Sequence, residues 1–208
     1  RDSVASRGLG DVYKRQGGIA APAPDNAELT GHWRQLSRLS AAFALTADMA
    51  LLSLGGALKR KEMLSGRLGD ILSELYLLAA CLKRFETEGR PEADRPLIEY
   101  VMRRGINRIG EAFDGIIANL PSRSAAFVVR AIAFPAGAPR VAVRDDLVSE
   151  VAELLMRPTS QRDRLTADLY LGAGRESYAI AELEEALDLV TRACLLYTSP
   201  SPRDATLS

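Results

Sequence analysis

The first candidates for chemistry in this sequence are three single side chains, His32, Cys81 and Asp48. His32 is the only histidine, and no Cys or Asp stands near it at a catalytic spacing. We therefore interpret it as an ordinary, partly exposed histidine. Cys81 falls beside an apolar stripe and is interpreted as a small packed residue. With a single histidine, a metal site built on His and Cys is not expected.

Asp48 and a short basic run each have two interpretations. Asp48 falls within the most apolar stretch, residues 39–58. It is either a buried acid in a binding pocket or a carboxylate paired with an Arg of the next helix, and we favour the pair. The run of Lys59, Arg60 and Lys61 either binds a phosphate of a cofactor or lipid or forms a solvated face, and we favour the solvated face.

The apolar stretch 39–58 is nearly long enough to span a bilayer. A carboxylate near the middle of such a span is costly in hydrocarbon, and Asp48 has that position. We therefore expect a helix buried in a protein core. The open alternative is that this apolar run, with the basic residues beside it, lies on anionic lipid.

Apolar spacing predicts two long helices around these groups. Apolar residues recur every three or four positions across 27–54, and Gly55 and Gly56 are expected to end this first helix. The second helix has a leucine-rich stripe and ends near Gly89. Gly66 and Gly69 interrupt its pattern, so we expect a neighbouring helix backbone to approach there. The stripe consists of Leu64, Leu68, Ile71, Leu72, Leu75, Leu78 and Leu82.

Further helices are separated by proline and glycine. Segments with alternating Val-rich pattern are nearly absent, so the predicted fold class is all-α, an antiparallel helical bundle of about five to seven helices. One helix is expected at 95–119, before Pro121, and the next is capped by Ser122 or Ser124 and ends at 134. A further helix is capped by Asp145 or Asp146 and ended by Pro158, and a short helix runs from Thr159 or Ser160 to Tyr170. The last helix is expected at 179–193, after Gly172 and Gly174.

The two ends of the chain differ from this helical part. Residues 6–16 (SRGLGDVYKRQ) and 194–204 (CLLYTSPSPRD) show no periodicity. Consider a DNA strand that encodes residues 6–16. Its reverse complement, read with a shift of one base, encodes residues 194–203, followed by a codon that can be Asp. We interpret 1–16 and 194–208 as translated adapter, resembling a transposon-type library adapter, rather than as two natural tails. A linker at 17–26 and a helical domain at 27–193, cut at both ends, are then expected.

Charge and cysteine content limit the partners of the remaining part. Five of the 27 basic and three of the 27 acidic residues lie in the two ends, which leaves 22 basic and 24 acidic residues. This balance does not indicate a nucleic-acid-binding surface. Because Cys194 lies in the second end, Cys81 has no partner for a disulfide within the helical part, which fits a reducing cytoplasm.

Four motifs follow one another within residues 36–89: LSRLSA at 36–41, LGGALKR at 54–60 followed by Lys61 and Glu62, RLGD at 67–70 and LKR at 82–84. Through these motifs, residues 36–89 resemble the matching segment of FadE-type bacterial acyl-coenzyme A dehydrogenases. Phe134 with Pro135 and the motif LEEAL at 183–187 fit downstream. The resemblance covers nearly all of 35–190, and it is to the helical region at the C-terminus of these enzymes.

The resemblance implies a parent flavoenzyme of fatty-acid β-oxidation. Such an enzyme oxidises an acyl-CoA to its trans-2-enoyl-CoA: FAD accepts a hydride, a carboxylate removes the α proton, and electrons pass to an electron-transfer flavoprotein. In the family, the catalytic carboxylate and most flavin contacts lie upstream of this region. No catalytic, cofactor-binding or metal-binding residue is therefore assigned. The acids Glu62, Glu74, Glu111 and Glu184 are interpreted as helix-surface carboxylates.

Two functions from different classes are consistent with these features. In the first, this helical module packs on an upstream catalytic body in cis, supports a homo-oligomer, or seats the enzyme on the membrane face. The parent binds FAD and acyl-CoA, and the isolated piece binds no cofactor and is inactive. In the second, the chain is a stand-alone helical interaction or membrane-surface protein without enzymatic activity. The expected location is the cytoplasm, with peripheral contact to the inner membrane.

Overall fold

The computed structural model describes residues 27–157, 159–167 and 179–198, which form parts of two compact units. The first unit extends to Val143 and the second begins at Arg144. All regular elements in the described ranges are helical, which confirms the all-α prediction. The first unit contains α2 (Ala27–Leu54), the 3-10 helix η1 (Gly55–Arg60), α3 (Glu62–Thr87), the 3-10 helix η2 (Glu92–Asp94), α4 (Arg95–Asn119) and α5 (Arg123–Ala133).

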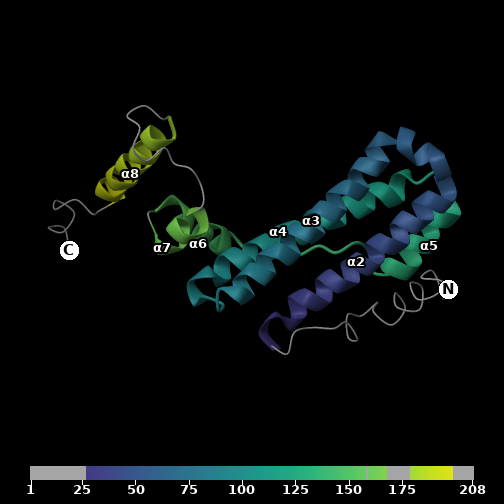
Figure 1. Ribbon diagram of the computed structural model, residues 1–208, viewed down its shortest axis with the longest axis horizontal. Coiled ribbons are helices and arrows are strands. Elements are labelled where there is room, and N and C mark those ends of the chain that lie inside the picture. The colour runs from purple at the N-terminus through teal and green to yellow at the C-terminus, as the bar shows by residue number, and fades with distance from the viewer. Residues whose placement is uncertain (1–26, 158, 168–178, 199–208) are drawn as a thin grey trace, which may run out of the picture. The chain divides into compact units, whose positions relative to one another are not determined.

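In the first unit, α3 and α4 lie side by side as a long antiparallel pair, and α2 packs on both α3 and α5 (Figure 1). The centre of the unit holds Leu39 from α2, Ile71 from α3 and Ile109 from α4, each at most 1% exposed. Phe113 of α4 and Phe134, which follows α5, meet with ring centroids 4.6 Å apart. Burial of each such side chain stabilises the fold by about 1.5–3 kcal/mol.

Local signals account for the ends of these helices. The predicted ranges of α2 and α4 agree with the structure. Gly55 and Gly89, with φ of 50° and 81°, adopt the left-handed backbone that glycine tolerates. Ser122 is the N-cap of α5, since its hydroxyl accepts a hydrogen bond from the amide of Ala125 at 3.2 Å. The choice left open between Ser122 and Ser124 is thereby decided.

The second unit contains α6 (Asp145–Met156), α7 (Ser160–Thr166) and α8 (Ala179–Thr198). Thr159 is the N-cap of α7, because its hydroxyl accepts from the Arg162 amide at 3.2 Å. The prediction that α7 reaches Tyr170 is wrong, because the helix ends at Thr166. Gly172 and Gly174 lie outside the described residues. Helix α8 begins at the predicted residue and continues beyond 193 into the end segment.

The predicted cap of α6 is also wrong. The N-cap is Arg144, which has extended backbone and makes no side-chain capping bond. Asp145 and Asp146 instead lie in the first turn, where negative charge suits the helix dipole. The Asp146 carboxylate accepts bonds from the Arg144 guanidinium at 3.0 and 2.7 Å and from the Leu147 amide at 2.9 Å. The Arg144 bond, with the amide bond next, lowers the pKa of Asp146.

The expected close approach at Gly66 and Gly69 is wrong as well. Apart from the backbone of its own helix, a Cβ at either position would meet no atom of the described residues within 4 Å. Close approaches occur on α4 instead, where a Cβ on Gly105 would lie 2.6 Å from the Leu78 side chain and one on Gly110 would overlap the Pro139 carbonyl oxygen. The reason is that both α3 and the segment after α5 pack against α4, whereas no described residue packs against the side of α3 that carries Gly66 and Gly69.

Helix α2 is only partly a core helix. Leu36, Leu39 and Ala42 are buried, but Leu51 and Leu52 near its end are 57% and 81% exposed. Together with η1, the stretch Leu29–Arg60 is long and apolar enough to cross a membrane by length and composition, and 22% of its most apolar window is buried. Core helices of soluble proteins also meet that test. The prediction that residues 39–58 form a helix buried in a protein core is therefore correct for one face of α2.

Candidate functional site

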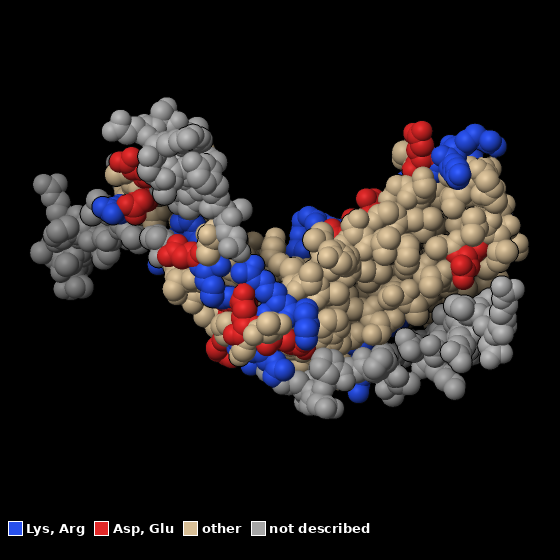
Figure 2. Space-filling model, in the orientation of Figure 1, with Lys and Arg blue, Asp and Glu red and all other residues tan. Residues whose placement is uncertain are grey.

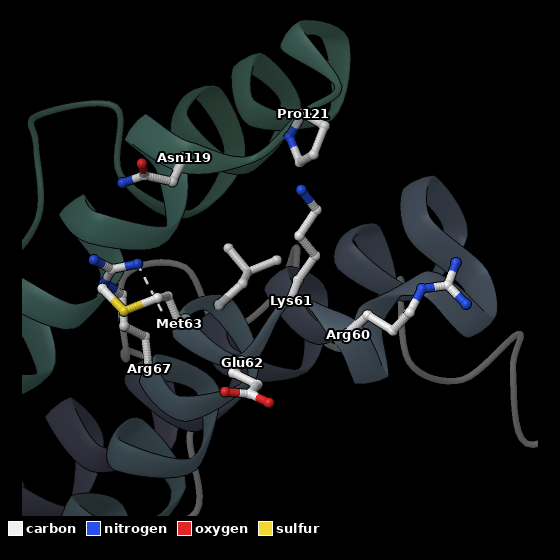
Figure 3. A pocket seen from close by; sticks show the side chains of 8 residues that line it. Arg60, Lys61, Glu62, Met63, Arg67, Asn119 and Pro121 are labelled. Atoms are coloured by element: carbon white, nitrogen blue, oxygen red, sulfur yellow. Dashed lines mark hydrogen bonds between the residues drawn. The ribbon is translucent and has the colours of Figure 1, made fainter.

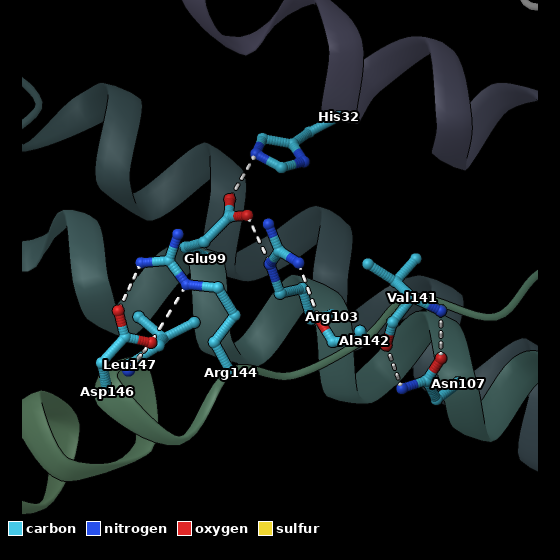
Figure 4. A network of polar contacts seen from close by, with 9 residues as sticks. All are labelled: His32, Glu99, Arg103, Asn107, Val141, Ala142, Arg144, Asp146 and Leu147. Atoms are coloured by element: carbon cyan, nitrogen blue, oxygen red, sulfur yellow. Dashed lines mark hydrogen bonds and ion pairs between the residues drawn. The ribbon is translucent and has the colours of Figure 1, made fainter.

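His32 has a tertiary partner that the sequence did not indicate. Its Nε2 lies 3.4 Å from Oε2 of Glu99, and its side chain is 26% exposed, as predicted. The other oxygen of Glu99 accepts a bond from Nε of Arg103 at 2.6 Å, and Arg103 also donates to the Ala142 carbonyl at 2.6 Å (Figure 4). This chain of contacts links α2, α4 and the segment after α5.

The arrangement around His32 is structural. A nucleophile activated by histidine must lie within hydrogen-bond reach of the imidazole. Among the described residues, no hydroxyl or thiol forms such a bond with His32. Because Arg103 also binds Glu99, the carboxylate is shared between the His32 imidazole and the Arg103 guanidinium. We infer that the contacts hold the start of α2 against the start of α4.

The two interpretations of Asp48 are both wrong. Its side chain is exposed, so it is not a buried acid, and no ion pair connects it to an Arg within the described residues. Among the described residues of the first unit, one face of α2 packs against α3 and α5, and Asp48 lies on the other face, whereas its neighbours Leu45 and Ala50 are buried. The carboxylate therefore remains in water.

Cys81 is half-buried on α3. Burial raises the pKa of its thiol, and the nearby Arg84 opposes this effect. A raised pKa reduces the fraction of reactive thiolate at neutral pH. The prediction of a small packed residue is consistent with this environment.

The four candidate carboxylates have different environments. Glu62 and Glu111 are exposed on helix surfaces, as predicted. Glu74 is not a simple surface residue, because its side chain is 17% exposed and accepts a bond from Arg108 at 2.9 Å, which joins α3 to α4. The side chain of Glu184 lies outside the described residues.

Asp94 is a buried carboxyl group that the sequence analysis missed. It lies in η2 directly before α4 and is 5% exposed. Burial raises its pKa, and the charge of Arg84 partly offsets that effect. The sequence contains no signal for this burial, because it depends on α3 and α4 meeting beside η2.

A groove of about 460 Å³ lies where η1 passes into α3. Figure 3 shows Lys61 directed toward Pro121 and Arg67 lying near Asn119, whereas Arg60 points away from them. The lining residues are Arg60, Lys61, Glu62, Met63, Leu64, Arg67, Asn119 and Pro121. Three cations against one carboxylate make the groove suitable for an anionic group.

A second groove of about 410 Å³ lies between α3 and α4. Its lining carries two basic residues, Arg67 and Arg108, and three acidic ones, and Arg108 is already paired with Glu74. This groove therefore has no excess of positive charge that would attract an anionic group. Its lining residues are Arg67, Asp70, Ser73, Glu74, Arg108, Glu111 and Ala112.

Residues 10–199 match the family model described as acyl-CoA dehydrogenase, C-terminal, bacterial type. The match agrees with the resemblance inferred from the motifs in residues 36–89. It begins and ends within the two segments interpreted as adapter, so the boundaries proposed for those segments stay a prediction. No solved structure matches the chain.

Proposed function

We propose that this chain, which belongs to the family of C-terminal domains of bacterial-type acyl-CoA dehydrogenases, is the non-catalytic helical end of an FAD-dependent enzyme. The parent oxidises a fatty acyl-CoA to its trans-2-enoyl-CoA in fatty-acid β-oxidation. An upstream body in cis binds FAD and acyl-CoA, and an electron-transfer flavoprotein takes the electrons. The observation that carries this proposal is the family match over residues 10–199.

The described residues do not fit FAD. Dinucleotide sites commonly place the pyrophosphate at a glycine-rich turn between a strand and a helix, and the described ranges contain helices without strands. The groove beside Lys61 is lined mostly by charged and polar residues, and Met63, Leu64 and Pro121 are its apolar ones. We therefore derive no flavin chemistry from this domain.

The carboxylates also support a non-catalytic role. A base that removes the α proton must face the substrate in a pocket. Glu62 and Glu111 are exposed, and Glu74 is held by Arg108. Asp94 is buried within the first unit, away from any described groove. None of these four groups has the surroundings of a catalytic base.

The outward side of α3 supports packing on a catalytic body. Leu72, Tyr76 and Leu77 lie within two turns and are 55%, 74% and 54% exposed. Figure 2 shows a broad surface of uncharged residues on the first unit. Contiguous exposed apolar surface commonly marks an interaction site. We assign this α3 surface to contact with the upstream body, and a homo-oligomer of the parent stays a prediction.

The uninterrupted gene tests the proposal directly. We expect an open frame upstream of Gly17 that encodes a flavin-dependent dehydrogenase body. Its purified product should be yellow and oxidise acyl-CoA, whereas the isolated chain should be colourless and inactive. A start codon with its own ribosome-binding site before Gly17 would favour the stand-alone interaction protein. A flavin spectrum in the isolated chain would show that this domain itself holds the cofactor.

The assigned α3 surface has a separate test. The substitutions Tyr76→Asp and Leu77→Asp place charges on side chains that are exposed in the isolated chain. We expect the pair to leave the isolated chain stable and to lower the thermal stability of the full-length parent. Equal effects on both proteins would mean that the surface does not contact the body.

Cytoplasmic location with peripheral contact to the inner membrane is also part of the proposal. The parent would then act on acyl-CoA from the cytoplasmic side. Cell fractionation of the full-length protein tests this part, with release of the protein from membranes by high salt as the expected result. Recovery only in a detergent-extracted fraction would instead indicate a membrane-spanning segment.

A further inference from the structure

We propose that the end of the first unit formed by Leu51, Leu52, Lys59, Arg60, Lys61 and Met63 docks on an anionic lipid surface. This set of residues is called the basic tip. The inference deepens the peripheral membrane contact in the proposed function. It concerns a different surface from the α3 contact with the catalytic body, and its test needs no enzymatic activity.

The apolar part of the basic tip is exposed in the structure. Leu52 is 81% exposed and Met63 is 73% exposed. They lie on either side of η1, at the last turn of α2 and the first turn of α3. Large apolar side chains at the end of a helical hairpin can enter the boundary between head groups and acyl chains, where burial of their surface is favourable.

The charges of the basic tip match an anionic surface. Lys59, Arg60 and Lys61 are all exposed, and no ion pair within the described residues neutralises them. Between Asp48 and Asp70, Glu62 is the only acidic residue, against these three cations and Arg67. Basic side chains next to apolar ones attract anionic lipid and lose this attraction as salt rises.

The groove beside the basic tip has a place for a lipid phosphate. Lys61, the N-cap residue of α3, and Arg67, within α3, line it, with the Asn119 end of α4 opposite them (Figure 3). A phosphate between the two cations receives charge-assisted hydrogen bonds. Lys59 and Arg60 are also exposed, so they remain available to other head groups. Figure 2 shows basic side chains at this end of the unit, beside uncharged surface.

The basic tip and the α3 surface are separated along one helix. From Met63 to Leu72 there are nine helical steps, which corresponds to about 14 Å at 1.5 Å per residue. A membrane at the basic tip therefore leaves the more distant Tyr76 and Leu77 open to the catalytic body.

Vesicle flotation with the full chain tests the proposal. The vesicles contain either phosphatidylcholine alone or phosphatidylcholine with phosphatidylglycerol, at low and high salt. We expect flotation with the anionic vesicles at low salt and release at high salt. No flotation at low salt, or equal flotation with both vesicles, would overturn the proposal.

Matched charge reversals locate the surface. Lys59→Glu with Lys61→Glu should weaken binding to the anionic vesicles by at least about thirtyfold, since each basic residue contributes to the attraction. Arg34→Glu with Arg104→Glu changes the same net charge at exposed positions outside the basic tip. This control should bind nearly as the unchanged chain does, and equal losses in both variants would contradict a localised site.

Two further measurements separate other occupants of the basic tip. Leu52→Ser with Met63→Ser should also reduce flotation, because it removes the apolar contact while the charge remains. Competition by inorganic phosphate at fixed ionic strength would indicate a soluble-anion site and overturn lipid docking. A change of oligomeric state on charge reversal, measured by light scattering without vesicles, would assign the basic tip to contact between copies of the chain and also overturn it.

Discussion

The side-chain amide of Asn107 forms two hydrogen bonds with the backbone of Val141. Its nitrogen donates to the Val141 carbonyl at 2.8 Å, and its oxygen accepts from the Val141 amide at 2.7 Å (Figure 4). The amide thus satisfies both polar groups of a residue that belongs to no helix or strand. Asn107 therefore positions the segment after α5 along α4.

Contacts on either side of this pair set the direction of the segment. The Pro139 carbonyl lies against Gly110, and the Ala142 carbonyl accepts from Arg103 at 2.6 Å. As the segment advances, its contacts therefore move toward the start of α4, so it runs antiparallel to that helix. We call residues 139–142 the strap.

We predict that Asn107→Ala destabilises the first unit by about 1–3 kcal/mol, because two half-buried backbone groups of the strap lose their partners. Urea unfolding measures the change, and hydrogen exchange at Val141 should become faster. Asn119→Ala is the control, since Asn119 bonds only to a carbonyl of its own helix at an exposed position. The control should change stability by less than about 0.5 kcal/mol.

Gly110→Ala should destabilise the first unit by about 1–3 kcal/mol, as expected for overpacking. The added Cβ would overlap the Pro139 carbonyl oxygen, so the strap must move away from α4. Thermal unfolding measures the loss. Gly66→Ala is the matched control, since it lies in an exposed helix position with open space and should be neutral or stabilising by up to about 1 kcal/mol. A neutral Gly110→Ala would show that the strap is not held against α4.

Asp94 should make stability depend on pH. Because burial raises its pKa above the ordinary value of 3.8, the folded state binds its proton more tightly than the unfolded state does. Its contribution is fully present below the unfolded pKa and is lost as pH rises through the folded pKa. We expect Asp94→Asn to gain stability relative to the unchanged chain between about pH 3 and pH 7. Denaturant unfolding across this range measures the difference, and a constant difference would contradict the assignment.

Removal of residues 1–16 and 194–208 should leave the thermal stability within about 0.5 kcal/mol, as expected for changes away from packed features. The interpretation of these ends as adapter is the reason for this expectation. Differential scanning calorimetry of the trimmed and full chains makes the comparison. A clear loss on trimming would show that the ends pack against the helical part.

Helix boundaries could be predicted because their signals are local. Gly55 ends α2 through a left-handed backbone, Pro121 follows α4, and Ser122 caps α5 with its own hydroxyl. Each of these effects acts within about one turn of the residue that causes it. The all-α class and the family resemblance also rest on ordered patterns along the chain.

The sequence by itself determined which segments are helical and to which family they are similar, since backbone preference and apolar period act over a few residues. Only the tertiary structure decided that His32 meets Glu99, that Gly110 rather than Gly66 admits a close neighbour, and that Asp48 remains in water. These outcomes depend on which helix faces meet. Apolar period leaves that choice open, because a stripe such as Leu64 to Leu82 shows which side is apolar but not what covers it.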